Sequence, residues 1–116
     1  MKNSGQGPAV LIIEDIDWIR AGMKKAVEGQ CYRVVEATNA AEAFELAEQE
    51  SIELILTEDE LPTFSSLMMR LSEHPTLRSV PIAMVNPDAE AGARLCNAYL
   101  LTDFADITSL LAVLRR

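Results

Sequence analysis

Residues 52–62 read Ile52-Glu53-Leu54-Ile55-Leu56-Thr57-Glu58-Asp59-Glu60-Leu61-Pro62, an apolar run that ends in three consecutive acids before a proline. An apolar run of this length predicts a buried strand. A second run, Ala9-Val10-Leu11-Ile12-Ile13, also ends in acids, Glu14 and Asp15. Open α/β folds bind their ligands at the carboxyl ends of such strands. If the two strands are neighbours, their acids form one pocket.

Length and charge restrict the classes of protein that fit. The chain has 116 residues, of which 49% are hydrophobic, so we expect one domain with its own core. The net charge is −8, from 18 acids and 10 bases. This excess of acids argues against direct binding to nucleic acid, which needs a basic face, and against docking on an anionic membrane. No apolar run approaches the roughly 20 residues of a membrane helix.

The N-terminal segment and the cysteines suggest the cellular compartment in which the protein is expected. Residues 1–8 are polar, without the apolar stretch of a signal peptide, and we expect a flexible tail before a single domain at 9–116. Cys31 and Cys96 fall in different predicted elements and are interpreted as free thiols. Without a signal or a disulfide framework, we expect a cytoplasmic protein.

Strands and helices alternate along the chain. Strands are predicted at 9–14, 32–36, 52–57, 81–85 and 98–101, and helices at 17–28, 40–50, 64–73, 88–96 and 106–115. This alternation predicts a parallel sheet with right-handed crossovers. It fits a flavodoxin-like doubly wound five-stranded sheet of order 2-1-3-4-5. Strands one and three are then neighbours, which brings Glu14 and Asp15 beside Glu58.

Local signals support several of these elements. The apolar positions of the first helix predict one buried face and are Trp18, Ile19, Gly22, Met23, Ala26 and Val27. Gly29 is expected to end that helix. Asn39 is a favourable N-cap for the second helix, with Glu42 as its capping-box partner. His74, the one histidine, lies in a polar loop and is expected to be exposed and inert.

With these elements placed, the sequence resembles the receiver domain of two-component response regulators over residues 9–114. The residues that carry the resemblance are Glu14-Asp15, the run Glu53-Leu54-Ile55-Leu56-Thr57-Glu58 with Pro62, the loop His74-Pro75 with Arg78 and Pro81, and Tyr99-Leu100. The resemblance implies a domain that accepts a phosphoryl group on an aspartate ending strand three. It also implies a histidine kinase, an output domain or another regulator as protein partner, and a homodimer as a further assembly.

The family's site can be traced residue by residue. Receivers hold Mg²⁺ with the acceptor aspartate, an acid after strand one and a backbone carbonyl two residues past the acceptor. Here the acceptor position is Glu58 and the carbonyl position is Glu60. The Ser/Thr that ends strand four is replaced by Asn86, and the lysine that ends strand five by Thr102. The aromatic residue of strand five is kept as Tyr99.

These departures remove the parts that phosphoryl transfer needs. The glutamate carboxylate reaches roughly 1.5 Å further than that of aspartate, into the space of the phosphoryl group. No lysine can be realigned to position 102, because the chain has only Lys2, Lys24 and Lys25. The charge that develops on the phosphoryl group then lacks its fixed cation. The segment between Asn86 and Tyr99 is also short, so we expect a shortened fourth helix.

The sequence therefore predicts a pseudo-receiver without enzymatic activity that signals by protein–protein interaction. Glu58 either imitates the phosphorylated aspartate, with Asn86 and Thr102 donating to it, or belongs to a site that has decayed. The alternative is a metal-dependent receiver that still accepts a phosphoryl group from a histidine kinase. The one cofactor prediction is weak Mg²⁺ binding by Glu14, Asp15, Glu58 and Glu60. The alternative is that these acids form only a solvated acidic rim.

Two rival families fit less well. The motif Asp15-Ile16-Asp17 after an apolar strand also occurs in haloacid-dehalogenase-like phosphatases, which need a later lysine and a longer chain. A flavin-binding flavodoxin needs a Ser/Thr/Gly loop after its first strand, whereas the acidic loop here would repel phosphate.

Overall fold

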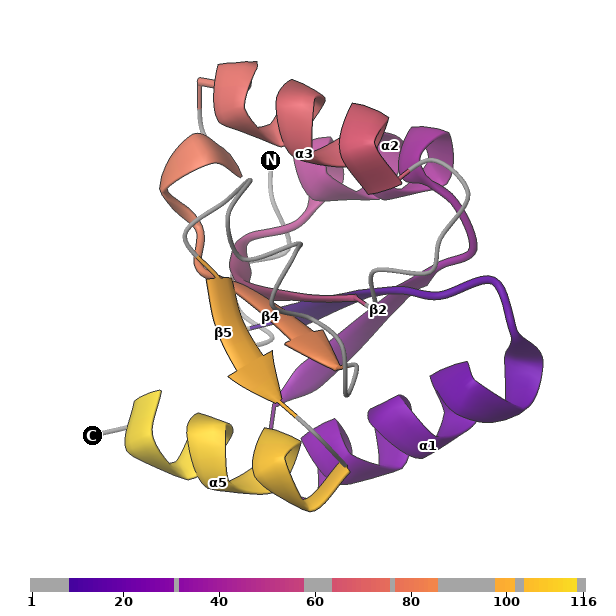
Figure 1. Cartoon of the computed structure of the whole chain (residues 1–116), viewed down its shortest axis with the longest axis vertical. Coiled ribbons are helices and arrows are strands. Elements are labelled where there is room, and N and C mark those ends of the chain that lie inside the picture. The colour runs from indigo at the N-terminus through magenta and orange to yellow at the C-terminus, as the bar shows by residue number, and fades with distance from the viewer. Residues whose placement is uncertain are drawn as a thin grey trace.

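A computed structural model of the chain describes residues 9–30, 32–57, 64–75, 77–85, 98–101 and 104–114 (Figure 1). The elements are β1 (Ala9–Ile13), α1 (Asp17–Glu28), β2 (Arg33–Ala37), α2 (Ala40–Gln49), β3 (Ile52–Thr57), α3 (Phe64–Glu73), the 3₁₀ turn η2 (Leu77–Ser79), β4 (Ile82–Val85), β5 (Ala98–Leu101) and α5 (Phe104–Leu114). Helices α1 and α5 cover one face of the sheet, and α2 and α3 cover the other (Figure 1).

The strands form one parallel sheet of order β2-β1-β3-β4-β5. The predicted flavodoxin-like, doubly wound fold and its strand order are therefore confirmed. Ile13 at the end of β1 pairs with Ala37 of β2 on one side and with Thr57 of β3 on the other. The carboxyl ends of these three strands thus lie level at one edge of the sheet.

The apolar strands are buried because helices cover both faces of the sheet. Alternate side chains of β1 enter opposite layers, as the two-residue period of a strand requires. Leu11 and Ile13 pack in the layer of α2 and α3. Val10 and Ile12 pack in the layer of α1 and α5. An uninterrupted apolar run such as residues 9–13 is the sequence signature of this double burial.

The predicted boundaries agree closely with the structure. Helices α1 and α3 and strands β3 and β5 begin and end where predicted, and the other described elements shift by one or two residues. The short turn η2 falls in a segment that was expected to be a loop. The predicted tail at 1–8, the shortened helix at 88–96 and both cysteines lie outside the described residues. Within the described part of the chain, no helix has both the length and the apolarity needed to cross a bilayer.

The prediction that Trp18 belongs to the buried face of α1 is wrong. Its side chain is 73% exposed, whereas Met23 and Val27 are buried. Met23 and Val27 are four residues apart and share one face of the helix. Trp18 precedes Met23 by five residues, which rotates it about 140° away from that face at 3.6 residues per turn. The apolar stripe of α1 therefore begins at Ile19.

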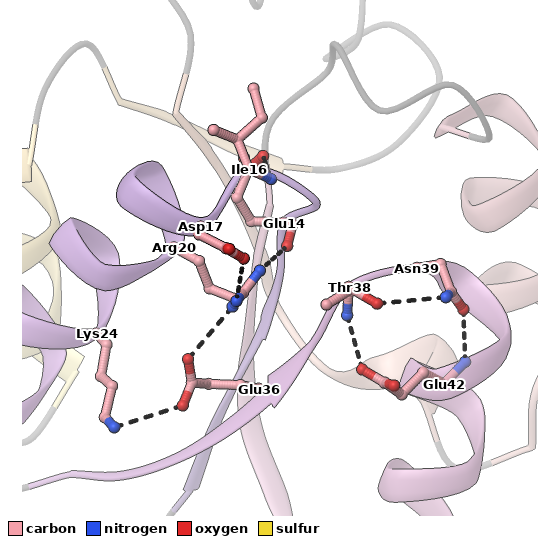
Figure 2. A network of polar contacts seen from close by, with 9 residues as sticks. All are labelled: Glu14, Ile16, Asp17, Arg20, Lys24, Glu36, Thr38, Asn39 and Glu42. Atoms are coloured by element: carbon pink, nitrogen blue, oxygen red, sulfur yellow. Dashed lines mark hydrogen bonds and ion pairs between the residues drawn. The ribbon is translucent and has the colours of Figure 1, made fainter.

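Two helix ends, the start of α2 at Asn39 and the end of α1 at Gly29, lie where the sequence predicted them. Asn39 caps α2 as predicted, since its Oδ1 accepts the backbone N–H of Glu42 at 2.9 Å. The Glu42 carboxylate accepts the N–H of Thr38 at 2.8 Å, one residue before the cap (Figure 2). Gly29 ends α1 as predicted, but in the ordinary right-handed conformation, with φ −63° and ψ −16°. This position therefore does not need glycine's freedom to adopt a positive φ.

Candidate functional site

The turn between β1 and α1 forms the described part of the candidate site. Glu14 follows β1 and donates its backbone N–H to the carbonyl oxygen of Ala37 at 3.0 Å, which continues the ladder with β2. The Glu14 side chain is fully buried, and its Oε2 accepts the backbone N–H of Ile16 at 3.0 Å. Glu14 thus folds its carboxylate back onto the turn that follows it.

Asp15 lies on the other side of this turn and is exposed to solvent. Ile16 next to it is 39% exposed. The two adjacent acids therefore have different environments: Glu14 is held inside the turn, and Asp15 faces water. Of the predicted metal ligands, these are the two that the structure describes. Among the described residues, no three His, Cys, Asp or Glu side chains form a cluster that could hold a metal ion.

The remaining predicted site residues follow strands that end at the same edge. Thr57, the last residue of β3, is fully buried and pairs with Ile13 and with Met84. Val85 ends β4 opposite Leu101, which ends β5. Glu58, Glu60, Asn86 and Thr102 come after these strand ends and lie outside the described residues. Tyr99 is placed in β5, where its backbone pairs with Ala83, but its side chain is not described.

Arg20 contacts several polar groups among the described residues at this edge (Figure 2). Its Nη1 donates to the backbone carbonyl oxygen of Glu14 at 3.0 Å, and its Nη2 donates to Asp17 Oδ1 at 2.7 Å. Its Nε donates to Glu36 Oε1 at 3.4 Å, and Lys24 Nζ lies 3.4 Å from the other oxygen of Glu36. One guanidinium group therefore joins the end of β1, the first turn of α1 and strand β2.

These contacts favour the protonated, positively charged form of Arg20. The hydrogen bond with Asp17 raises the pKa of Arg20 above its ordinary value, the attraction of Asp17 and Glu36 adds to the rise, and desolvation opposes it. Arg20 was not among the site residues predicted from the sequence. The spacing of Asp17 and Arg20 on one helix was a usable signal. The contact with Glu36 was not, because it depends on how β2 lies beside α1.

His74 is not exposed as the sequence suggested. Its side chain is 22% exposed, and its Nδ1 accepts the backbone N–H of Leu77 at 3.0 Å. The ring stacks on Phe44 of α2 with centroids 6.2 Å apart, and the Arg70 guanidinium lies 4.3 Å over the same Phe44 ring. The tertiary contact between α2 and the end of α3 covers this histidine. These contacts lie in the layer of α2 and α3.

Comparisons with known proteins agree with this geometry. The family described as response regulator receiver domain matches residues 10–99. A transcriptional regulatory protein, SrrA of Staphylococcus aureus, is 32% identical over 88 residues, which cover 74% of this chain. The aligned part is 35% of SrrA, so this chain corresponds to about a third of that relative.

Solved structures share the fold. The receiver domain of a sensor histidine kinase from Pseudomonas aeruginosa superposes with a TM-score of 0.77 at 23% identity, covering 92% of this chain and 96% of that one. A chemotaxis response regulator of Vibrio cholerae gives a TM-score of 0.75 at 19% identity, covering 93% and 97%. The sheet order, the acids after β1 and the family match over most of the chain lead to one conclusion: the chain belongs to the response regulator receiver domain family.

Proposed function

We propose that this receiver domain acts in two-component-type signal transduction by protein–protein interaction, without phosphorylation at position 58. The observation that carries the proposal is Glu58 directly after Thr57, the residue that ends β3 level with the end of β1. The family places its acceptor aspartate there. A glutamate puts its carboxylate roughly 1.5 Å further from the backbone, where the incoming phosphoryl group would have to lie.

The positions of the lysines also support the proposal. Phosphoryl transfer needs a cation that offsets charge on the transferring group. Lys24 and Lys25 lie on α1, and the Lys24 ammonium contacts Glu36 at 3.4 Å. Lys2 belongs to the N-terminal segment, and Thr102 occupies the position after β5 that the family's lysine takes. Neither helix lysine follows a strand at the carboxyl edge.

Two versions of the proposal differ in the role of Glu58. In the first, its carboxylate imitates the phosphorylated aspartate and holds the domain in one signalling state, with Asn86 and Thr102 as hydrogen-bond donors. In the second, the site no longer switches and the fold serves only for docking. Glutamate supplies one negative charge on a planar group, whereas a phosphoryl group carries nearly two on a tetrahedral one. The imitation is therefore partial at best.

The acidic edge fits weak binding of Mg²⁺, for which carboxylate oxygens are suitable ligands. The Pseudomonas receiver domain holds a magnesium ion in its active-site cleft. In this chain Asp15 is exposed at the matching end of β1. Glu14 uses Oε2 for the turn. We propose that Asp15 contacts the cation together with Glu58 and the carbonyl of Glu60, and that Glu14 acts mainly by shaping the turn.

The partner we propose is a protein. SrrA is a transcriptional regulatory protein, and this chain matches about a third of it. By analogy, a histidine kinase, an output domain or another regulator would read the state of this domain in the cytoplasm, with no enzymatic step in the chain itself. The net charge of −8 disfavours nucleic acid as a direct partner.

Incubation with acetyl phosphate and Mg²⁺, followed by intact mass measurement, tests the central claim. We expect no gain of a phosphoryl group by the natural sequence. The Glu58→Gln variant is the matched control, because it removes the carboxylate and keeps the length of the side chain. A gain in the natural protein that is lost in Glu58→Gln would overturn the proposal in favour of a working, metal-dependent receiver.

Amide NMR spectra with Mg²⁺ and then with beryllofluoride, which imitates a bound phosphoryl group, test whether the site still switches and whether it binds the metal. Shifts that spread from β3 to β4 and Tyr99 on beryllofluoride would show a working switch and contradict the proposal. Shifts with Mg²⁺ alone, confined to the acidic edge, would agree with metal binding without phosphoryl transfer.

A further inference from the structure

We propose that Arg20 is a positioning residue that sets the direction of Asp15 at the acidic edge. This inference rests on the proposed role of Asp15 as a cation contact, and it identifies a residue that positions the backbone of Asp15. The guanidinium of Arg20 lies beside the turn and donates to the carbonyl oxygen of Glu14. This carbonyl group belongs to the peptide that joins Glu14 to Asp15, so Arg20 holds the backbone directly before Asp15 (Figure 2).

The peptide groups on both sides of Asp15 are held by hydrogen bonds. The peptide before it contributes the Glu14 carbonyl oxygen, which accepts from Arg20 Nη1 at 3.0 Å. The peptide after it contributes the Ile16 N–H, which donates to Glu14 Oε2 at 3.0 Å. Fixing both flanking peptide groups restricts φ and ψ of Asp15. A restricted backbone fixes the position and direction of the Asp15 Cα–Cβ bond, which limits the space that the exposed carboxylate reaches and so helps to preorganise it as a cation ligand.

Arg20 is itself held from three directions. Besides the Glu14 carbonyl, it donates to Asp17 in the first turn of α1 and to Glu36 on β2. Its side chain is 16% exposed, while that of Asp17 is 91% exposed. A surface ion pair of Arg20 with Asp17 alone would contribute little. The planar fork of an arginine can bond several acceptors at once, which the single ammonium of a lysine cannot do in the same geometry.

The positioning role and a pure charge effect predict opposite results. Removing a cation near an acidic edge should by itself strengthen Mg²⁺ binding, because carboxylates that repel one another gain more from the metal. Loss of positioning should weaken binding, since residues that orient metal ligands typically change affinity roughly tenfold or more. The direction of the change therefore distinguishes the two.

The test compares Arg20→Gln, Arg20→Lys and Lys24→Gln. Lys24 is the matched control, because it lies on the same helix and contacts the same Glu36 but is not bonded to the turn. Hydrogen exchange of the Ile16 amide, relative to the Leu11 amide in the core strand β1, reports the turn without any metal. Mg²⁺ titration is followed by the fluorescence of Trp18, the only tryptophan, which is 73% exposed near this turn.

We expect Ile16 exchange relative to Leu11 to rise about tenfold in Arg20→Gln and in Arg20→Lys, and to stay unchanged in Lys24→Gln. We expect Mg²⁺ binding to weaken roughly tenfold in both Arg20 variants.

Equal acceleration of exchange at Ile16 and Leu11 would mean that Arg20 only stabilises the fold. An Arg20→Lys variant with the exchange ratio and Mg²⁺ affinity of the natural protein would mean that charge alone matters. Either result overturns the inference. If the natural protein does not respond to Mg²⁺, the metal part of the proposed function fails, and the exchange ratio still decides the role of Arg20.

Discussion

Oε2 of Glu14 accepts the backbone N–H of Ile16 at 3.0 Å, and the Glu14 side chain is completely buried. Asp15, the next residue, is exposed. The family's adjacent acids after β1 thus have different physical roles in this chain. The first shapes the turn from inside, and the second offers its carboxylate to solvent.

This difference predicts that two neighbouring substitutions change the free energy of unfolding by different amounts. Glu14→Ala should lower the free energy of unfolding by about 1–3 kcal/mol, because the Ile16 N–H loses the acceptor that the buried Glu14 side chain provides. Asp15→Asn should change it by less than about 0.5 kcal/mol, as is usual at exposed positions. Urea unfolding measures both, with Glu14→Gln as a control that keeps an acceptor oxygen. Equal losses at positions 14 and 15 would contradict the assignment.

Gly29→Ala should stabilise the protein by about 0.4–1 kcal/mol, because alanine restricts the unfolded chain. The folded conformation accepts a side chain here, since φ is −63°. An added Cβ would lie 3.7 Å from the carbonyl oxygens of Ala26 and Lys25, which is ordinary van der Waals contact. Thermal unfolding measures the change. A lower melting temperature would mean that the end of α1 needs glycine after all.

His74→Ala should cost about 1 kcal/mol, because the Leu77 N–H loses the acceptor that Nδ1 provides. Leu77 is a buried residue of the core, so the turn before β4 should loosen as well. Glu48→Gln is the control. Its carboxylate lies 3.9 Å from His74 Nε2 and is 72% exposed, so we expect a change within about 0.5 kcal/mol. A large loss in Glu48→Gln would show that the contact with Glu48, not the turn, matters.

The contribution of Arg20 to stability should not depend on pH near neutrality. Its contacts raise the pKa of the guanidinium above an ordinary value that is already strongly alkaline. A raised pKa contributes stability that is fully present below the unfolded value and is lost only as the pH rises through the folded one. The stability difference between the natural protein and Arg20→Gln should therefore be equal at about pH 7 and about pH 9. A difference that shrinks at the higher pH would contradict this assignment.

Restoring two family residues should restore phosphoryl transfer if the proposed function is correct. Glu58→Asp shortens the nucleophile, and Thr102→Lys returns the cation that follows β5 in the family. We expect the double variant to gain one phosphoryl group from acetyl phosphate and Mg²⁺ in intact mass spectra. Each single variant serves as a control and should gain less. No gain in a folded double variant would indicate that Asn86 or the short segment after it also blocks the reaction.

The fold and most of the element boundaries could be predicted from the order of the residues alone. The apolar runs at 9–13 and 52–57 are buried strands, and the alternation of strands with helices predicted a parallel sheet, for which the flavodoxin-like strand order is confirmed. The role of Asn39 as the N-cap of α2 could also be predicted, because its hydrogen-bond partner Glu42 is only three residues away. Such features depend on period and on near neighbours, which a sequence displays directly.

The contacts that hold the turn after β1 depend on how the helices and strands pack together. The contact of Arg20 with Glu36 joins residues that are 16 positions apart, and it requires α1 to lie beside β2. The burial of Glu14 and the covering of His74 by Phe44 likewise depend on which elements pack together. A hydrogen bond has directional geometry and a reach of about 3 Å. Its partners across a fold are therefore set by strand register and helix placement, which the order of the residues does not display.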